Sequence, residues 1–453
     1  MTKKPIKNGE IVKLELEDLA YGGDAVARKD EFVIFVQGGL ADETALVQIT
    51  EVKKSYGRGK VVKIIKSSKQ RQESFCDYSN NCGGCQLDYL NYQGQLKFKQ
   101  QMLKDNLERI GDIDEPEVEA TIGMEHPYFY RNRAQFPLAI NDKDEISKGF
   151  YQARSHNLVE IEDCQLQHQL INRVARKTLK VLNEYQLSAY DEESHAGLLR
   201  HLVIKVGVCT NQALAILVTK EEKFPQALEI AERLMELIPE LKGVVQNINP
   251  AETNVVLGQN NKTLAGENYI YDYIGPLKYK ISPLSFFQVN TLQAEKLYQQ
   301  VKEYAQLSGE EKVLDAYCGI GSIGLYLADE AAQITGIEVV DEAVEMAKEN
   351  ARINGIDNYQ ILKGTVAERI NQLKNEFDVV IVDPPRKGCG EEVINDLIKL
   401  EAEKIIYVSC NPASLSRDIG YLTEAGYQLN QIQPVDMFPH TYHVETVAVL
   451  ESS

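Results

Sequence analysis

The sequence predicts a multidomain protein with a small β-barrel in residues 1–66, a mixed α+β domain in residues 67–275 and an α/β domain in residues 276–453. Three observations lead to this division. At 453 residues the chain is too long for a single hydrophobic core. The first part contains short segments of alternating polar and apolar residues. The last part alternates apolar runs with helix-like segments, and the middle part mixes both patterns.

Composition indicates an ordinary globular protein, with 43% hydrophobic and 26% charged residues. The first residues, "MTKKPIKNGE", lack the apolar stretch of a signal peptide, and no run approaches 18 apolar residues. We therefore expect a cytoplasmic protein without a membrane span. Eight cysteines in such a chain favour metal binding or catalysis over disulfide bonds.

The net charge of −18 would argue against a nucleic-acid partner, but the charge is unevenly distributed. Residues 52–72 hold eight Lys and Arg side chains and no acidic one. Residues 1–66 carry twelve basic and ten acidic side chains, a net of +2. This basic segment is either a solvated charged surface or a contact for RNA.

Segments such as "IVKLELEDLA" and "EFVIFVQGG" indicate about five short strands in the first part of the chain. Strands of this length and number suit a small OB-like barrel, a fold that often binds oligonucleotides on one face. The segment "NGEIVKLELEDLAYGGDAVAR" also resembles the start of a TRAM domain, an RNA-binding module of that fold.

The central part begins with three closely spaced cysteines, Cys76, Cys82 and Cys85, in a C-x5-C-x2-C pattern. Such a cluster is difficult to explain by packing, so we expect a metal site. Cys164 is the candidate for a fourth ligand, because Cys209 lies within an apolar strand. Four thiolates satisfy either zinc or a 4Fe–4S cluster, and the spacing alone slightly favours zinc.

The rest of the central part predicts both helices and strands. "LNYQGQLKFKQQMLKDNLERIG" has helical spacing and is expected to end at Gly111, where glycine would cap the helix. "HLVIKVGVC" and "QALAILVT" are typical of strands. The segment "YFYRNRAQFP" alternates aromatic residues with Arg131 and Arg133. It is either a surface for splayed RNA bases or a half-buried strand with two surface arginines.

From about residue 276 the alternation of strands and helices predicts a doubly wound, Rossmann-like parallel sheet with ligands at the C-terminal strand ends. Gly319 opens a G-x-G-x-x-G loop, and Glu338 follows at the end of the next strand. This pattern suits NAD or S-adenosylmethionine. "VDPPR" then favours S-adenosylmethionine, because Asp383 with two prolines resembles the catalytic loop of methyltransferases that act on nucleic-acid bases.

Cys410, in "VSCNP", follows an apolar strand, and Asn411 and Pro412 after it predict a turn. A thiolate beside Asp383 and a methyl donor can add to carbon 6 of uracil, which makes carbon 5 nucleophilic; a base must then remove the carbon-5 proton. For the base, "FPHTYHVETVAVL" offers His440, His443 and Glu445, and the residues alone leave these alternatives open.

"SCNP", "HVET", "DPPRKG", "LDAYCGIGSIG" and "SFFQVN" together resemble the RNA uracil-5-methyltransferase family, over nearly the full chain. The resemblance implies that Cys410 is the nucleophile and Glu445 the base. It implies that the cofactor contacts, together with Gly319 of the glycine loop, are Gln288, Tyr317, Glu338 and Asp383. RNA cytosine-5 methyltransferases place a second cysteine directly after the proline of this loop. Here Arg386 holds that position, and we interpret Cys389 as a bystander.

Within this family the ribosomal-RNA branch carries the C-x5-C-x2-C pattern and a distant cysteine on a 4Fe–4S cluster, which the resemblance transfers to Cys76, Cys82, Cys85 and Cys164. It implies that the substrate is 23S rRNA, since transfer-RNA members generally lack the TRAM and cluster segments. A tRNA substrate and an inactive RNA-binding assembly factor remain the alternatives. We expect a monomer without membrane contact.

Overall fold

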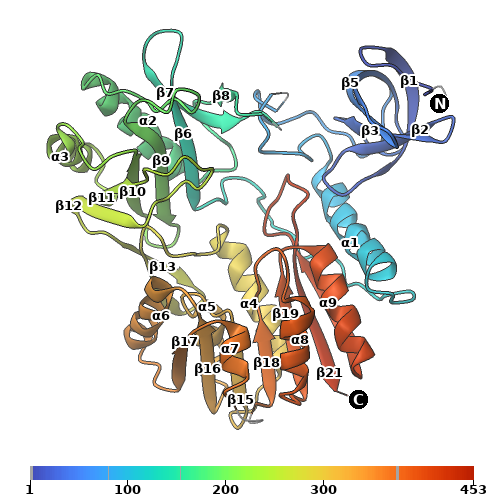
Figure 1. The fold of residues 1–453 in the computed structure, drawn as a ribbon, viewed down its shortest axis with the longest axis vertical. Coiled ribbons are helices and arrows are strands. Elements are labelled where there is room, and N and C mark those ends of the chain that lie inside the picture. Colours follow the sequence, from blue (N-terminus) through green and yellow to red (C-terminus); the bar gives the residue numbers. More distant parts are fainter. Residues whose placement is uncertain (1–3, 80, 154, 374–376, 453) are drawn as a thin grey trace.

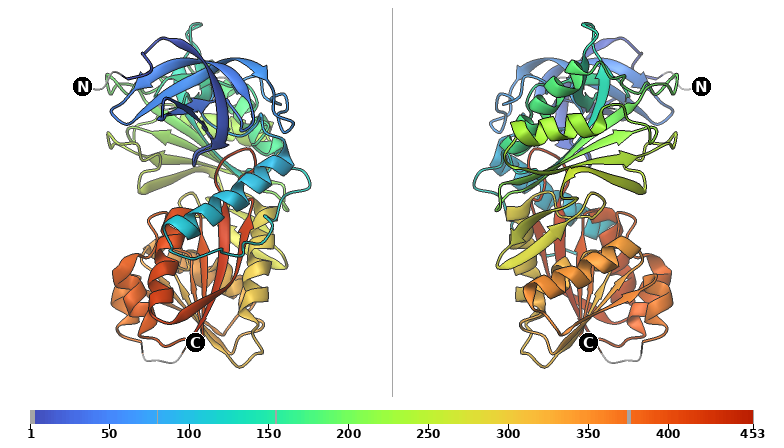
Figure 2. Two further views of the ribbon diagram at one scale, coloured as in Figure 1. Left: turned by 90° about the vertical axis from the view of Figure 1, so that its right-hand side faces the viewer. Right: turned by 90° about the vertical axis from the view of Figure 1, so that its left-hand side faces the viewer.

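The computed structural model describes residues 4–79, 81–153, 155–373 and 377–452. These residues form a closed barrel, two seven-stranded sheets and a two-stranded hairpin. Figures 1 and 2 show the barrel and the central sheet together at one end of the molecule and the C-terminal sheet at the other end. None of the helices in the described residues combines the length and apolar composition needed to span a lipid bilayer.

The N-terminal barrel contains β1 (Ile11–Leu19), β2 (Ala25–Lys29), β3 (Phe32–Gln37), β4 (Thr44–Val52) and β5 (Tyr56–Lys66). In β1, Val12, Leu14 and Leu16 are buried while the residues between them are exposed, as the alternating sequence predicts. β1 pairs with both β2 and β4, and β3 pairs in parallel with β5. These pairings close the barrel in the order β1-β2-β3-β5-β4.

The central domain is a mostly antiparallel sheet with helices on one face. Its elements are β6 (Arg133–Ile140), β7 (Ile146–Tyr151), β8 (Leu158–Glu160), α2 (Gln169–Glu184), β9 (Leu199–Gly207), β10 (Gln212–Thr219), α3 (Ala227–Leu237), β11 (Leu241–Ile248) and β12 (Asn260–Gly266). The order of the described strands is β12-β11-β10-β9-β6-β7-β8. Helices α2 and α3 share a core with one face of this sheet. Val203, Ile216 and Val245 on the other face share a core with the C-terminal domain. Because both faces are covered, β9 is buried along its whole length.

The C-terminal domain follows a hairpin of β13 (Ile270–Ile274) and β14 (Leu277–Ile281). Its strands are β15 (Lys312–Ala316), β16 (Gln333–Glu338), β17 (Tyr359–Lys363), β18 (Val379–Val382), β19 (Lys404–Ser409), β20 (Tyr427–Val435) and β21 (Glu445–Ser452). Its helices are α4 (Thr291–Ala305), α5 (Ser322–Leu327), α6 (Asp341–Asn354), α7 (Val366–Ile370), α8 (Gly390–Ile398) and α9 (Pro412–Glu424).

The C-terminal sheet has the order β17-β16-β15-β18-β19-β21-β20. Its first five strands in the chain are parallel, as the alternation with helices predicts. The prediction of an all-parallel sheet is wrong for the last two strands, because β21 lies antiparallel between β19 and β20. A short loop, residues 436–444, joins β20 to β21, and a short connection favours antiparallel neighbours.

Helix α1 (Tyr92–Arg109) lies in the predicted central part of the chain but packs against α9 and β20 of the C-terminal domain, as Figure 1 also shows. It ends at Arg109, Ile110 is the C-cap residue, and Gly111 follows with its N–H donating to the carbonyl oxygen of Asn106 at 3.3 Å. A Cβ atom on Gly111 would lie 2.9 Å from the carbonyl oxygens of Leu107 and Ser416. The glycine is therefore needed because the chain passes very close to α9. The domain boundaries themselves stay a prediction.

Candidate active site

Polar side chains gather at one edge of the C-terminal sheet. Tyr317 directly follows β15, and Glu338 ends β16. Asp383 and Cys410 directly follow β18 and β19. Because β21 runs antiparallel to β19, its first residue, Glu445, reaches the same edge. Strand direction alone therefore brings these five residues together.

A single cavity of about 770 Å³ opens at this edge, and we call it the strand-end cavity. All seven residues predicted to act in catalysis or cofactor binding line it: Gln288, Tyr317, Gly319, Glu338, Asp383, Cys410 and Glu445. A volume of this size is typical of sites for small molecules and cofactors. The structure thus brings the predicted residues together, while their individual roles stay predictions.

The glycine loop forms one side of the strand-end cavity. The Gly319 N–H donates to Glu338 Oε2 at 3.0 Å, and Glu338 Oε1 accepts from the N–H groups of Val339 and Val340. Tyr317 has φ +67°, a left-handed conformation that is unfavourable for a tyrosine. Backbone strain of this kind is found at functional sites more often than elsewhere. Here the left-handed conformation of Tyr317 turns the chain into the glycine loop.

The loops that carry Asp383 and Cys410 are joined through the backbone of Arg386. Its carbonyl oxygen accepts from Asn411 Nδ2 at 2.8 Å and from Ser414 Oγ at 3.1 Å. The predicted turn at Asn411 and Pro412 is instead the start of α9, where Asn411 caps the helix. Proline is favourable in this first turn because its missing N–H would have no helical partner. Cys410 is therefore held directly before a helix N-terminus.

Three acidic groups face one another in the strand-end cavity. Desolvation, followed by the nearby Glu445 and Asp383 carboxyls, raises the pKa of the Cys410 thiol to about 11. Desolvation and the neighbouring Asp315 raise the pKa of Asp383 to about 7. Burial and then Asp383 raise the pKa of Glu445 well above its usual range. The cavity thus favours the protonated forms of all three groups. A positive charge bound there would favour their ionised forms instead.

The structure separates the three candidates for the base. His443 and Glu445 line the strand-end cavity with Cys410. His440 is fully buried and packs on Phe75 and Tyr128, outside the lining of the cavity. Burial and the nearby Arg386 lower the pKa of His443 to about 4, so its imidazole is neutral at pH 7. The position of His440 thus leaves His443 and Glu445 as candidates.

Arg386 is a functional candidate that sequence reasoning missed. It is exposed at the cavity, and its guanidinium lies 3.3 Å from His443 Nε2. The same positive charge acts to lower the pKa of both Cys410 and Glu445. Its place directly after Asp-Pro-Pro was the available signal. Cys389 also lines the cavity, and burial raises the pKa of its thiol to about 12, which leaves it protonated.

Helix α1 anchors the loop 436–444 that carries His443. Lys99 donates to Asp436 and to the carbonyl oxygen of Phe438, and both partners of this ion pair have fully buried side chains. Tyr92 Oη donates to Asp436 Oδ2 at 2.8 Å, and the His440 N–H donates to Gln95 Oε1 at 2.8 Å. No sequence pattern identified this anchor.

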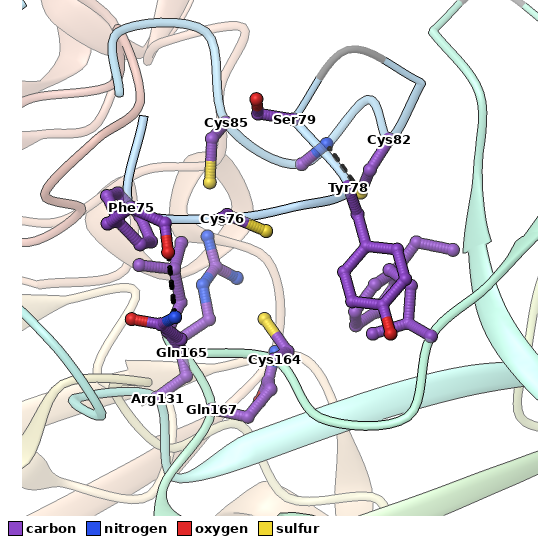
Figure 3. A pocket seen from close by; sticks show the side chains of 14 residues that line it. Phe75, Cys76, Tyr78, Ser79, Cys82, Cys85, Arg131, Cys164, Gln165 and Gln167 are labelled. Atoms are coloured by element: carbon purple, nitrogen blue, oxygen red, sulfur yellow. Dashed lines mark hydrogen bonds between the residues drawn. The ribbon is translucent and has the colours of Figure 1, made fainter. Parts of the chain in front are cut away.

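The four front cysteines line a second cavity, of about 150 Å³, which we call the cysteine cavity. Figure 3 shows Cys76, Cys85 and Cys164 with their sulfur atoms turned toward its interior, and Cys82 beside them. Burial is the main cause that raises the pKa of Cys76, Cys82 and Cys85. Among the described residues, no three His, Cys, Asp or Glu side chains converge on one metal-ion position. The structure therefore does not show the predicted metal site as a coordination centre, although it gathers the four thiols.

The two arginines that were expected at the surface are only partly exposed. Arg131 lines the cysteine cavity, and its guanidinium lies 5.8 Å from the centre of the Phe438 ring, which lines the strand-end cavity. Arg133 begins β6, where desolvation lowers its pKa. Arg131 thus lies between the two cavities, and neither arginine is one of the exposed phosphate contacts that the alternation suggested.

Comparison with known proteins gives consistent results. The tRNA (Uracil-5-)-methyltransferase family model matches residues 91–453, and the TRAM domain model matches residues 5–62. A protein named uncharacterized RNA methyltransferase from Halalkalibacterium halodurans is 43% identical, and the match covers 99% of this chain and 98% of that protein. Another protein with this name, from Caldanaerobacter subterraneus, is 45% identical, and the match covers 98% of this chain and 99% of that protein. The crystal structure of Pyrococcus abyssi tRNA (uracil-54, C5)-methyltransferase with S-adenosyl-L-homocysteine has a TM-score of 0.79 and 30% identity; the match covers 97% of this chain and 99% of that one.

Proposed function

Because the chain belongs to the tRNA (uracil-5-)-methyltransferase family, we propose that it methylates carbon 5 of a specific uridine in 23S rRNA through a covalent adduct with Cys410. The observation that carries this proposal is the strand-end cavity, where Cys410 and the buried Glu445 lie beside a glycine loop and Glu338. An inactive assembly factor would have no need for these residues in one cavity.

The residues divide the reaction between them. Gln288, Tyr317, Gly319, Glu338 and Asp383 would hold S-adenosylmethionine, which supplies an electrophilic methyl group when it is bound. Cys410 loses its thiol proton to solvent, its sulfur adds to carbon 6 of the uracil, and the electron pair of the ring double bond passes to carbon 5. Carbon 5 then takes the methyl group, and the donor leaves as a thioether that keeps the electron pair of the broken carbon–sulfur bond. A base removes the carbon-5 proton, the ring electrons return, and the bond from sulfur to carbon 6 breaks.

Glu445 is the better base of the two that remain. The pKa of His443 is lowered to about 4, which makes its imidazole a weak base, whereas the raised pKa of Glu445 makes its carboxylate a stronger base once it is ionised. Arg386 lies close enough to stabilise the ionised carboxylate before the proton is transferred. His443 would then orient Arg386 or contact the substrate.

The choice of RNA is tested by incubating unmodified transcripts of 23S rRNA and of tRNA with the protein and tritiated cofactor. Mapping of 5-methyluridine in cells with and without the gene identifies the site. tRNA is a second candidate, since the similar Pyrococcus abyssi structure is a tRNA (uracil-54, C5)-methyltransferase that matches 97% of this chain. The barrel and the cysteine segment therefore do not by themselves distinguish an rRNA enzyme from a tRNA enzyme. Label only in tRNA would overturn our choice.

We also propose that Cys76, Cys82, Cys85 and Cys164 bind a 4Fe–4S cluster. Support comes from the four cysteines around one cavity, whose volume of about 150 Å³ exceeds the space that a single ion needs. Protein purified without oxygen should be brown and contain about four iron and four sulfide per chain. One zinc per colourless chain would contradict the cluster and leave the methyltransferase proposal unchanged.

The remaining proposals concern the state of the protein. We propose that it acts as a cytoplasmic monomer on RNA, because one chain supplies the barrel and the complete strand-end cavity. Sedimentation of the purified protein with and without RNA tests the monomer.

A further inference from the structure

Four aromatic rings form a continuous row from the barrel to the strand-end cavity. The ring centres of Tyr21 and Tyr442 lie 5.2 Å apart, those of Tyr442 and His443 lie 4.2 Å apart, and those of His443 and Phe438 lie 5.9 Å apart. We call these four residues the aromatic row. His443 and Phe438 line the cavity, whereas Tyr21 lies on the barrel, in the turn between β1 and β2.

Tyr21 is not explained by the packing of the barrel. Tyr21 is 53% exposed, and among the described residues it is not part of the barrel core. Its ring instead contacts Tyr442 in an edge-to-face arrangement. Burial and then Tyr442 raise the pKa of Tyr21, while Arg386 lowers it and Cys410 raises it slightly. The hydroxyl of a barrel residue therefore lies within electrostatic range of the proposed nucleophile.

The barrel is held firmly in this position. Arg71 donates to both carboxylate oxygens of the buried Glu43, at 2.6 and 2.8 Å, and to the carbonyl oxygen of Gly38 at 2.8 Å. The Arg71 guanidinium also lies 5.0 Å from the centre of the Tyr89 ring, and Tyr89 Oη donates to the carbonyl oxygen of Gly23 at 3.2 Å. These contacts fix the turn that carries Tyr21, so its place beside the cavity is a feature of the fold.

The adjoining segments strengthen this arrangement. Leu40 of the barrel forms a small apolar cluster with Leu87 and Leu90, and Tyr442 packs against it. The N–H groups of Gln86 and Leu87 donate to the carbonyl oxygen of His440. Figure 1 shows the loop between β20 and β21 rising from the C-terminal sheet toward this junction. The barrel, the segment before α1 and the loop 436–444 thus meet at the entrance of the cavity.

The chemistry of the aromatic row suits unstacked bases. Aromatic faces and guanidinium planes are the surfaces on which proteins stack bases that have left a helix. Arg386 contacts His443, and the Arg131 guanidinium lies 5.8 Å from the centre of the Phe438 ring. A target uridine must leave its stack to reach Cys410, and the bases next to it then lose a stacking partner. The aromatic row runs from the surface into the cavity and provides these bases with a new stacking partner.

We propose that the aromatic row holds the nucleotide next to the target uridine, with the exposed Tyr21 stacking on its base. The barrel then forms part of the active-site entrance and helps to select the sequence or loop that presents the uridine. This inference rests on the proposed function, because it needs an RNA whose target base enters the strand-end cavity.

The test compares RNA binding by the full-length wild type, Tyr21→Ala and Tyr21→Phe, using the unmodified 23S rRNA and tRNA transcripts. Loss of one base–ring stack should raise the Kd of the preferred transcript about tenfold in Tyr21→Ala. Tyr21→Phe keeps the ring and should bind within about twofold of the wild type. The KM for S-adenosylmethionine should not change in either variant, because Tyr21 does not line the cofactor side of the cavity.

Ile11→Ala is the matched control, since Ile11 is an apolar barrel residue with 55% exposure and lies outside the aromatic row. It should leave RNA binding unchanged. Equal Kd values for Tyr21→Ala and the wild type, or equal losses for Ala and Phe, would overturn the stacking role. A wild type that binds RNA but methylates neither transcript would instead overturn the proposed function, so the two failures are distinguishable.

Discussion

The two cavities of this protein both contain cysteines but are built in opposite ways. In the strand-end cavity, five of the predicted residues end, directly follow or begin strands of one sheet, so the backbone hydrogen bonds of the sheet hold them in place: Tyr317, Glu338, Asp383, Cys410 and Glu445. The cysteine cavity is formed by the loop around Cys76, Cys82 and Cys85 and by Cys164 from a distant segment. The sheet fixes the backbone around the first cavity, whereas a group bound by the four thiols would hold the second together.

This difference has a consequence for stability. The sheet forces Asp383, Cys410 and Glu445 into a desolvated space where their charged forms are unfavourable. That arrangement costs folding free energy and is useful only for the reaction. A cluster bound in the cysteine cavity would instead cross-link the loop, which contributes folding free energy. Substitutions in the two cavities should therefore change stability in opposite directions.

The largest expected effect is on turnover. Cys410→Ala cannot form the adduct and should lose at least about 10⁴-fold in rate, with unchanged binding of RNA and cofactor. Glu445→Gln keeps the thiol, so it should add to the ring, transfer the methyl group and then stall before proton removal. Denaturing electrophoresis with tritiated cofactor should show a labelled protein–RNA complex for Glu445→Gln and none for Cys410→Ala.

Two outcomes would contradict this division of roles. Rapid release of methylated RNA by Glu445→Gln would assign the base to His443, the other candidate in the cavity. A covalent complex in Cys410→Ala would assign the nucleophile to another residue. Cys209→Ser is the control. The expectation that Cys209 lies within an apolar strand is wrong, because β9 ends at Gly207 and Cys209 is exposed. It also lies outside the strand-end cavity.

The second prediction concerns the cysteine cavity. Cys85→Ser removes one of the four proposed ligands and should lower the iron content and the free energy of unfolding, by roughly 2–5 kcal/mol, if the cluster holds the loop. Thermal unfolding and metal analysis measure both quantities, again with Cys209→Ser as the control. Unchanged iron and unchanged stability in Cys85→Ser would show that the cavity does not depend on a bound group.

The strand-end residues were predictable from the sequence for a physical reason. In a parallel sheet, alternation of strands and helices places every strand end at one edge, so Glu338, Asp383 and Cys410 could be grouped without a structure. Glu445 was grouped correctly because it opens an apolar run, although its strand proved to be antiparallel. For these residues the local sequence pattern and the topology of the sheet predict the same position in the molecule.

Features that depend on packing between distant segments were not predictable. The helical pattern of α1 does not indicate which partner it packs against, and nothing in it distinguishes the buried Lys99 from the exposed lysines of the chain. The role of Gly111 depends on the approach of α9, a neighbour far away in sequence. Arg131 was expected at the surface, but it is only partly exposed, because it lines the cysteine cavity and its guanidinium lies 5.8 Å from the centre of the Phe438 ring in the loop 436–444.

The third prediction sharpens the contrast in stability. The pKa of Asp383 is about 7 in the folded protein and near its usual value of 3.8 in the unfolded chain, so folding favours the protonated form. Its contribution is therefore fully present below about pH 4 and is lost as the pH rises to about 7. Asp383→Asn should have the stability of the wild type at acid pH and gain up to about 4 kcal/mol at pH 8, with loss of activity.

Thermal unfolding at about pH 4 and at about pH 8 measures this gain. Asp357→Asn, at an exposed aspartate, serves as the control. A gain at pH 8 for Asp383→Asn with a loss for Cys85→Ser would confirm that the two cavities act on stability with opposite signs. Destabilisation by Asp383→Asn at pH 8 would show that Asp383 supports the fold, and the contrast would then fail.

The smallest expected effect concerns the charge at the mouth of the strand-end cavity. Arg386 is the cation that opposes the rise of the Cys410 pKa, which lies at about 11 against a usual value near 9. Only the thiolate reacts with iodoacetamide, so alkylation of Cys410 should become faster with rising pH across the range from 8 to 10. Arg386→Gln removes the positive charge, raises the pKa further and should slow alkylation roughly three- to tenfold at each pH. Arg386→Lys keeps a positive charge and should show a smaller change.

Peptide mass spectrometry separates Cys410 from the other cysteines, and Cys209, which lies outside the cavity, provides an internal reference with an unchanged rate. Faster alkylation in Arg386→Gln would mean that the arginine shields the thiol sterically, and its electrostatic role would have to be abandoned.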